Sequence, residues 1–267
     1  MADDGIERLR RWRDEDRGVP PAFGRLGARL EETRPGRTVV RLPLSPELAL
    51  PAGVPTAAVT SLLADFGLTT AVIASLPDLR GVQTVSMTVD HLAPPAAGGS
   101  LVARCTASPY DGGRPQHAAG TMHDEDGRTV ATASGWLLAA PADAVHAERV
   151  GLVHEPPAAH LLALLGVDAD AAFVLHARDA LSNALGTLHG GIGALASQLA
   201  AETALAEAAP GLRPLTSAFT YLRPTPRDGS VTVTGTVVRA GRRTGAAAAS
   251  VEGPDGRVVL QCALVAG

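Results

Sequence analysis

The chain has 267 residues, of which 46% are hydrophobic and 19% charged, and this length is enough to bury one large core or two small ones. Its formal net charge is -4, and it lacks the excess of basic residues that is typical of nucleic-acid binders, so we expect no nucleic-acid partner. Residues 1–18 are densely charged and contain no apolar stretch of the kind found in signal peptides. No apolar run approaches the roughly 18–20 residues of a membrane span. We therefore expect a cytoplasmic protein that does not enter a membrane.

The two cysteines, Cys105 and Cys262, lie in strand-like stretches and have no spacing that suits a metal ion. We expect both to be buried thiols in a reducing cytoplasm. Aromatic residues make up only 3% of the chain, so the core is expected to consist mainly of Ala, Val and Leu.

In chain order, residues 1–25 are predicted to form an additional N-terminal helix and a proline-containing linker. Residues 36–44 are the first predicted strand, and a glycine-containing loop then leads into a helix of roughly 15–20 residues. This helix is apolar around most of its circumference, which predicts that it is buried. Three strand segments follow, separated by turn signals such as Asp126-Gly127.

The second half of the chain repeats this order, beginning with a predicted strand at residues 171–179 and including an alternating strand at residues 230–238. Three pairs of segments align in the same order and at nearly constant spacing: 50–71 with 183–204, 87–101 with 217–231, and 124–139 with 252–267. Gly53 matches Gly186 in the first pair. The sequence therefore predicts a duplicated domain.

One buried helix followed by an antiparallel meander is an α+β pattern, and it fits a sheet wrapped around a central helix. The predicted division of the chain is an N-terminal extension (1–25), a first domain (26–140), a linker (141–158) and a second domain (159–267).

A motif that suggests chemistry stands directly before the second helix, where Asn183, Gly186, His189, Gly190 and Gly191 follow one another at close spacing. Two glycines let the backbone approach a ligand, and a helix N-terminus offers free N–H groups and the positive end of the helix dipole. Together they would suit an oxyanion hole for a thioester carbonyl. The alternative is that the glycines only permit a tight turn and that His189 caps the helix.

This motif, N-x-x-G-x-x-H-G-G before a central helix, resembles the hot-dog-fold acyl-CoA thioesterase superfamily, in particular its PaaI-like branch, and the resemblance covers most of each half. It implies a double hot-dog chain, α+β, with two tandem domains that each have a central helix wrapped by an antiparallel sheet. It also implies a catalytic carboxylate nine positions after the histidine, a Ser or Thr on the following strand, and sites formed across a two-fold interface between two hot dogs.

The second half departs from this pattern, because Gln198 stands nine positions after His189 and Pro214 aligns with the Ser/Thr position. The first half departs in the opposite way. Its motif positions are occupied by Leu50, Thr56, Ala57 and Ala58, whereas Asp65 stands nine positions after Thr56 and Thr84 aligns with the Ser/Thr position. Each half has kept what the other half lacks.

Nine residues of helix span about 13–14 Å, so a carboxylate cannot act on a substrate held at the start of its own helix. If the two central helices run antiparallel, the start of one meets the middle of the other. The sequence therefore predicts one complete composite site, formed by Asp65, Thr84, Asn183, His189, Gly190 and Gly191. The reciprocal site is predicted to lack catalytic groups. The alternative for Asp65 is an ordinary ion pair on the helix surface.

In this site Gly190, helped by Gly191, is predicted to bind the thioester oxygen, and Asp65 is predicted to act as a general base or as a nucleophile. Thr84 would position water or the carboxylate. Asn183 and His189 would hold the loop and orient water or the carbonyl. The resemblance implies no metal and no redox cofactor, since CoA is part of the substrate. Arg223, Arg242 and Arg243 are candidates for the basic rim that contacts the CoA phosphates.

The predicted function is the hydrolysis of an acyl-CoA to free acid and CoA. Two alternatives are a non-catalytic acyl-CoA-binding or regulatory protein and a hot-dog hydratase. A hydratase would carry an Asp and a His close together on a loop and helix start, and the sequence shows no such pair. Pairing of two such chains into a homo-oligomer through edge strands is also expected from the resemblance.

Overall fold

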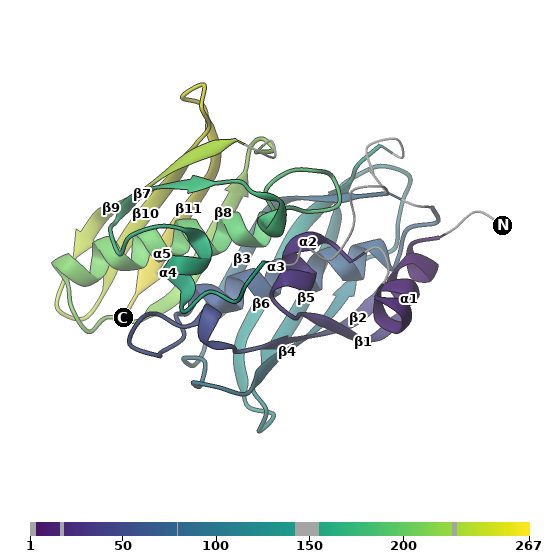
Figure 1. Cartoon of the computed structure of the whole chain (residues 1–267), viewed down its shortest axis with the longest axis horizontal. Helices are drawn as coiled ribbons and strands as arrows, with labels where there is room; N and C mark the ends of the chain where they lie inside the picture. The colour runs from purple at the N-terminus through teal and green to yellow at the C-terminus, as the bar shows by residue number, and fades with distance from the viewer. Residues whose placement is uncertain (1–3, 17–18, 79, 142–154, 226–228) are drawn as a thin grey trace.

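The structure is a computed structural model that describes residues 4–16, 19–78, 80–141, 155–225 and 229–267. Most of the predicted linker (142–154) and parts of the predicted N-terminal extension (1–3 and 17–18) lie outside the described residues. The described strands form a single eleven-stranded sheet in the order β1-β2-β4-β5-β6-β3-β8-β11-β10-β9-β7. Figure 1 shows the two halves of the chain side by side, the first in purple to blue-green and the second in green to yellow.

The first half contains α1 (Gly5–Glu15), α2 (Pro21–Arg25), β1 (Arg29–Arg34), β2 (Arg37–Pro43), the 3-10 helix η1 (Pro46–Leu48), α3 (Ala58–Ile73), β3 (Val82–His91), β4 (Ser100–Ala107), β5 (Gln116–His123) and β6 (Thr129–Ala139). The second half contains α4 (Leu161–Leu165), β7 (Ala172–His176), the 3-10 helix η4 (Asp179–Leu181), α5 (Gly190–Ala208), β8 (Pro214–Tyr221), β9 (Ser230–Ala240), β10 (Gly245–Glu252) and β11 (Val258–Ala266). This is the predicted double hot-dog architecture, in which each half has one long central helix against an antiparallel meander.

The two halves meet where β3 pairs antiparallel with β8, at the centre of the sheet. In this pairing Thr88 lies opposite Ala218, the residue with which the internal sequence alignment matches it. An antiparallel pair centred on two equivalent residues relates the halves by a pseudo-two-fold axis. The duplication read from the sequence is therefore visible in the register of the sheet.

The loops that precede the two central helices have the same backbone geometry although their sequences differ. Gly53 and Gly186 both adopt a positive φ, at 78° and 71°, which glycine accommodates without strain. Equivalent isolated bridges join Ala49 to Pro55 and Ser182 to Leu188. The match between the two glycines, made from sequence, therefore marks a shared turn.

Both central helices are buried, as their apolar composition predicted; every residue of α3 except Thr69 is buried. They run antiparallel to each other. Ser61 donates to Gln198 across the helix pair at 2.6 Å, and Asp65, one turn later on α3, lies against Gly190 near the start of α5. This arrangement is the one that the composite-site prediction requires.

Three strand segments were predicted after each central helix, but the structure has four in each half, β3 to β6 and β8 to β11. Two further elements, β1 and α4, were not predicted from the sequence. β1 carries four charged residues in the stretch RLEETR, so its hydrophobic alternation is hard to recognise, yet it pairs with β2 at the edge of the sheet. The five-residue helix α4 is too short for a periodic signal and contacts η1. Both elements depend on tertiary packing more than on local pattern.

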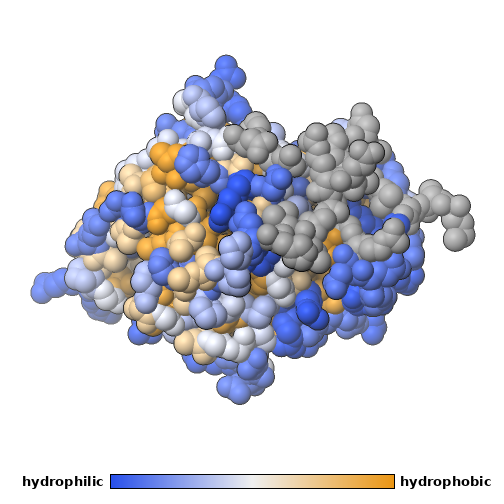
Figure 2. Space-filling model, in the orientation of Figure 1, coloured by the Kyte–Doolittle hydropathy of each residue, from blue (hydrophilic) through white to orange (hydrophobic). Residues whose placement is uncertain are grey.

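The two halves differ on the one face of the molecule that Figure 2 shows. Figure 2 shows apolar side chains gathered over the second half, on the left of this view, and mostly hydrophilic side chains toward the right. Among the large apolar side chains that are exposed are Val174 of β7 and Val237 and Val238 of β9. Within the described residues, no helix combines the length and the hydropathy that crossing a bilayer would require. Cys105 and Cys262 are buried in strands, as predicted.

Candidate active site

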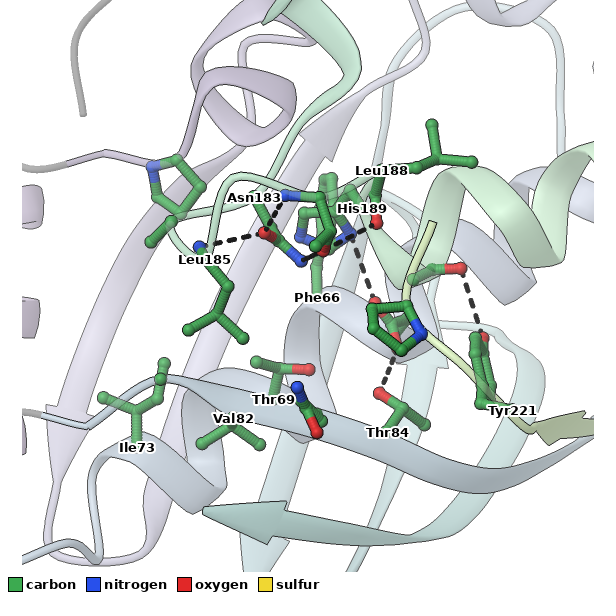
Figure 3. Close-up of a pocket in the computed structure, with 18 of the residues that line it drawn as sticks. Phe66, Thr69, Ile73, Val82, Thr84, Asn183, Leu185, Leu188, His189 and Tyr221 are labelled. Atoms are coloured by element: carbon green, nitrogen blue, oxygen red, sulfur yellow. Dashed lines mark hydrogen bonds and ion pairs between the residues drawn. The ribbon is translucent and has the colours of Figure 1, made fainter. Parts of the chain in front are cut away.

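A pocket of about 300 Å³ lies where α3, the start of β3 and the loop before α5 meet. Figure 3 shows Thr69 and Thr84 on one side of it and Asn183, Leu185 and His189 on the other. The residues of the predicted composite site line this pocket or, in the case of Gly191, lie directly behind its wall.

Asp65 lies in the middle of α3 with a side chain that is 2% exposed. The Thr84 hydroxyl donates a hydrogen bond of 2.6 Å to one carboxylate oxygen of Asp65. The other carboxylate oxygen lies 3.2 Å from Nδ1 of His189, which comes from the second half of the chain (Figure 3). The structure therefore brings the acidic residue of one half to the histidine of the other.

Gly190 and Gly191 begin α5 at the point where it crosses α3. A Cβ atom on Gly190 would lie 3.1 Å from both carboxylate oxygens of Asp65, and one on Gly191 would lie 3.0 Å from the Leu62 carbonyl oxygen. Glycine is needed here because any side chain would push the helices or the carboxylate apart. In the described part of the chain, the Gly190 N–H donates no hydrogen bond, so it remains available at the helix N-terminus.

His189 is the N-cap of α5, and its Nδ1 lies 3.1 Å from the Gly191 nitrogen. A single ring nitrogen cannot accept a proton from Gly191 and donate one to Asp65 at the same time. Two arrangements follow. Either an unprotonated Nδ1 accepts from Gly191, or a protonated Nδ1 donates to Asp65 and leaves the Gly191 N–H free as a second donor.

Asn183 holds the loop before α5 and uses its side chain inside that loop. Its amide oxygen accepts from the Leu185 and Thr187 nitrogens at 2.9 and 3.1 Å, and its amide nitrogen donates to the Thr187 hydroxyl at 2.8 Å. Of the two roles predicted for Asn183, holding the loop is the one that these bonds describe.

The three arginines expected at the CoA rim do not lie together. Arg223 lines the exposed side of the pocket and donates to the Val258 carbonyl. Arg242 and Arg243 are exposed in the turn between β9 and β10 and do not line the pocket. That turn lies near the far end of α5, because a Cβ on Gly245 would touch Leu205 at 2.8 Å, and the 19 residues of α5 span about 28 Å.

Tyr221, at the end of β8, is a pocket residue that the sequence reasoning missed. Its hydroxyl donates to the Gly190 carbonyl at 3.2 Å. Burial, together with the nearby Asp65 carboxylate, raises the pKa of Tyr221 well above its usual value, so the phenol keeps its proton. The internal alignment offered a signal, since it matches Tyr221 with His91, which contacts the first turn of the other central helix through Thr60.

The reciprocal position, at the start of α3, was predicted to lack catalytic groups, but it contains a carboxylate. Glu202 of α5 accepts hydrogen bonds from Thr56 at 2.6 Å and from Gln198 at 2.7 Å. Burial raises the pKa of Glu202 to about 7, and the bonds from Thr56, Gln198 and the Ala58 amide partly oppose this rise. The N-terminus of α3 is thus already occupied by a side chain of the protein.

The rest of the reciprocal position is a closed polar network. Gln198 also contacts His91 at 3.3 Å, and His91 contacts the Thr60 and Ser217 hydroxyls at 3.0 Å each. Burial lowers the pKa of His91 to about 4, so its ring is neutral at neutral pH. The remaining residues aligned with the motif are Leu50 and Ala57, both half-buried, Ala58, which is buried, and Pro214, which begins β8.

Comparison with known proteins gives a match over the second half. Residues 179–266 match the family model described as the acyl-CoA thioesterase N-terminal domain. No curated protein matches the chain. The PaaI-like branch stays a prediction.

Solved structures resemble the whole chain at low sequence identity. A candidate oleoyl thioesterase from Lactobacillus plantarum has a TM-score of 0.61 at 10% identity and covers 86% of this chain and 95% of its own. The tesB protein of Mycobacterium avium subs paratuberculosis has a TM-score of 0.59 at 11% identity, with coverages of 89% and 94%. The 12:0-ACP thioesterase from Umbellularia californica has a TM-score of 0.58 at 11% identity, with coverages of 86% and 94%. These matches show a shared fold over almost the full length of each structure.

The second half of the chain is thus similar to the acyl-CoA thioesterase N-terminal domain, and the chain shares its tandem fold with these thioesterase structures.

Proposed function

We propose that the chain hydrolyses an acyl-CoA thioester at one composite site between its two halves. The observation that carries the proposal is the meeting of Asp65 and Thr84, from the first half, with the unpaired N–H of Gly190, from the second. A buried carboxylate next to a free helix N-terminus offers a base or nucleophile and an oxyanion donor within reach of one carbonyl.

In the hydrolytic step, the thioester oxygen accepts a hydrogen bond from the Gly190 N–H while the carbonyl carbon is attacked. If Asp65 acts as base, it takes a proton from water as the water oxygen bonds to the carbon. If Asp65 is the nucleophile, its oxygen bonds to the carbon and water later cleaves the anhydride. In both routes the carbon–sulfur bond breaks and the thiol leaves with a proton. Thr84, which donates to Asp65 at 2.6 Å, holds the carboxylate in place.

His189 links the two parts of the site. When Nδ1 donates to Asp65, the Gly191 N–H becomes a second donor next to Gly190, and the oxyanion site gains a hydrogen bond. The protonation of Nδ1 therefore determines whether one or two backbone N–H groups are free to donate to the thioester oxygen. Tyr221 supports the same turn by donating to the Gly190 carbonyl.

The carrier of the acyl group is proposed to be CoA, in keeping with the family model over residues 179–266. One structural neighbour is described as a 12:0-ACP thioesterase, so acyl carrier protein is the competing carrier. Assays should therefore offer the same acyl groups on both carriers and follow release of the free thiol.

Two substitutions, one at each of two equivalent positions in the central helices, test the composite site. Asp65→Asn should abolish thiol release, because it removes the base or nucleophile while keeping the shape of the side chain. Gln198→Ala, at the matching position of the other helix, should retain most of the turnover even though it opens the buried network. Equal loss in the two purified, folded variants would contradict the composite-site proposal.

A second candidate function is hydration of an enoyl thioester. The sequence showed no adjacent Asp and His, but the structure brings Asp65 and His189 within 3.2 Å across the halves. Because the Asp65 carboxylate and the His189 ring face each other, only one of the two side chains is free to act on a substrate. Hydrolysis is therefore the better supported reaction. Incubation with crotonyl-CoA and mass analysis of the products separates the two, since hydrolysis yields free CoA and hydration yields a hydroxyacyl-CoA.

The third possibility, a regulatory protein that only binds acyl-CoA, predicts saturable binding without thiol release from any acyl group in the panel. The free Gly190 N–H next to the buried Asp65 carboxylate argues against it, because a binding protein needs no base or nucleophile beside an oxyanion donor.

A further inference from the structure

The pocket has an exposed side and a buried end. Gln83, Val85 and Arg223 are exposed at the side where Thr84 and Tyr221 lie. The N-terminal segment that contains α1 and α2 closes the opposite end. The buried residues that line the pocket there are Arg8, Trp12, Pro20 and Phe23. A thioester held at Asp65 with its carrier outside would therefore point its acyl chain at α1.

The wall between the two ends is aromatic. Trp12 and Phe23 have ring centroids 6.2 Å apart, Phe23 and Phe66 4.7 Å, and Phe66 and His189 4.6 Å. The lining of the pocket also follows α3 from Asp65 to Ile73, a distance of about 12 Å along the helix. This wall would suit the apolar middle of an acyl chain.

Arg8 ends this apolar path with a positive charge. The residue is 7% exposed, its guanidinium carbon lies 5.0 Å from the centre of the Trp12 ring, and one nitrogen donates to the Arg80 carbonyl at 3.2 Å. Burial lowers the pKa of Arg8 to about 10, so the side chain is still charged at neutral pH. Among the described residues, no carboxylate forms an ion pair with it.

Trp12 offers a second donor at the same end. The indole N–H of Trp12 is buried without a hydrogen-bond acceptor in the described protein, and Trp12 lines the pocket beside Arg8. A buried charge without a counter-charge is unfavourable. A guanidinium has five N–H donors, and one hydrogen bond from Arg8 to the described protein is seen. If this end only had to seal a hydrocarbon pocket, an apolar residue would serve better.

We propose that Arg8 and the Trp12 indole bind a carboxylate at the far end of the acyl chain, so that the substrate is the thioester of a dicarboxylic acid. This inference rests on the proposed thioesterase function and names its substrate class. The acyl group has an apolar middle that contacts Phe23 and Phe66, and it is long enough for its terminal carboxylate to reach Arg8 while its thioester lies at Asp65.

The test compares thioesters of equal chain length that end in a methyl or a carboxylate group: octanoyl-CoA with suberyl-CoA and decanoyl-CoA with sebacyl-CoA. The wild-type chain should prefer the carboxylated member of at least one pair by about 10-fold or more in kcat/KM, as expected for a charge-assisted hydrogen bond. Arg8→Met, which keeps an apolar stem, should reverse this preference. Arg8→Lys should keep part of it.

The matched control is Arg10→Met, because Arg10 lies on the same helix but is exposed and pairs with Glu7. This variant should leave both rates and the preference unchanged. Melting temperatures identify variants that fail to fold, and in that case the wild-type comparison alone decides.

The outcomes separate the two proposals. If the wild-type chain hydrolyses the methyl-ended members equally well or better, or if Arg8→Met lowers both members of a pair by the same factor, the inference is wrong and the thioesterase function stands. If no thioester of either kind is hydrolysed, the proposed function itself is wrong.

Discussion

Gly190 shows why a single residue decides the chemistry at the start of α5. Its missing side chain lets Asp65 approach, and its N–H is unpaired in the described structure. Ala57, the equivalent residue before α3, carries a Cβ atom, and the helix start there is occupied by Glu202 through its bonds to Thr56 and the Ala58 amide.

Replacing Gly190 with Val should lower kcat by about 100-fold or more, the effect of losing one oxyanion donor, because the new side chain would fill the space next to both carboxylate oxygens of Asp65. Ala57→Val is the matched control and should reduce stability at most. Steady-state kinetics and thermal midpoints should be measured for both variants. Normal turnover in a folded Gly190→Val enzyme would show that the carbonyl is bound elsewhere.

Single site residues could be located from the sequence where they occupy the positions of a motif. Asp65 and Thr84 were found by applying the pattern that the family resemblance implies to the two aligned halves, and the structure joins them by a 2.6 Å hydrogen bond. Arg8 and Tyr221 were missed, because their roles depend on which distant backbone and side-chain atoms the fold brings near them. For Arg8 the sequence offers no motif at all, and for Tyr221 the only signal is its alignment with His91.

The pairing of α3 with α5 explains how one site was kept while the other became a structural network. At the active crossing, a carboxylate on α3 faces two glycines of α5. At the reciprocal crossing, Gln198 and Glu202, one turn apart on α5, bond to Ser61 and Thr56 of α3. The second crossing therefore contributes to stability and not to the proposed reaction.

The raised pKa of Glu202 gives this network a pH dependence. Its value of about 7 exceeds the ordinary value of 4.5, so in this interval the folded chain keeps a proton that the unfolded chain releases. Glu202 therefore stabilises the fold fully below about pH 4.5, and this contribution is lost as pH rises through 7, with a slope of at most about 1.4 kcal/mol per pH unit. In Glu202→Gln this loss should be absent, so its free energy of unfolding should rise relative to wild type between pH 5 and 8.

Urea denaturation of both proteins across this range gives the difference directly. The lowered pKa of His91 has the opposite effect, adding stability as pH rises from about 4 to 6.5, but it is present in both proteins and cancels to first order. Glu207→Gln, on the exposed side of the same helix, is the control and should follow wild type. Parallel curves for wild type and Glu202→Gln would contradict the account of this network.

The long elements were predictable, and the short ones were not. The central helices follow from apolar runs that only a buried helix satisfies, and the turn glycines Gly127 and Gly256 both adopt the positive φ expected after Asp. β1 and α4 lacked such signals. Glu202 was missed for a related reason: in a helix pattern it resembles a solvated residue, and only the packing of α5 on α3 shows that it is half-buried and bonded to Thr56.

The whole molecule is a pseudo-dimer in one chain, with a continuous sheet through β3 and β8 (Figure 1). Its N-terminal extension closes one end of the pocket. The duplication followed from the sequence, whereas the antiparallel crossing of the helices was a condition of the composite-site prediction that the structure meets. The role of the extension did not follow from the sequence, because the described residues of the second half offer no counterpart of α1 with which to compare it. Pairing of two chains through edge strands stays a prediction.

Loss of symmetry has a consequence for binding. A chain with two intact sites would bind two acyl-CoA molecules, whereas this chain should bind one, because Glu202 occupies the α3 N-terminus and Gln198 stands where Asp65 stands in the other site. The binding should also be lost or greatly weakened by Gly190→Val and kept in Ala57→Val.

The most direct measurement is calorimetric titration of the wild-type chain with a non-hydrolysable acyl-CoA thioether, followed by a crystal structure of the complex. The account predicts one tight site per chain, with the group that replaces the thioester between Gly190 and Asp65 and the acyl chain extending toward α1. Two equivalent sites per chain, or a ligand lying against Gln198 and Glu202, would contradict it.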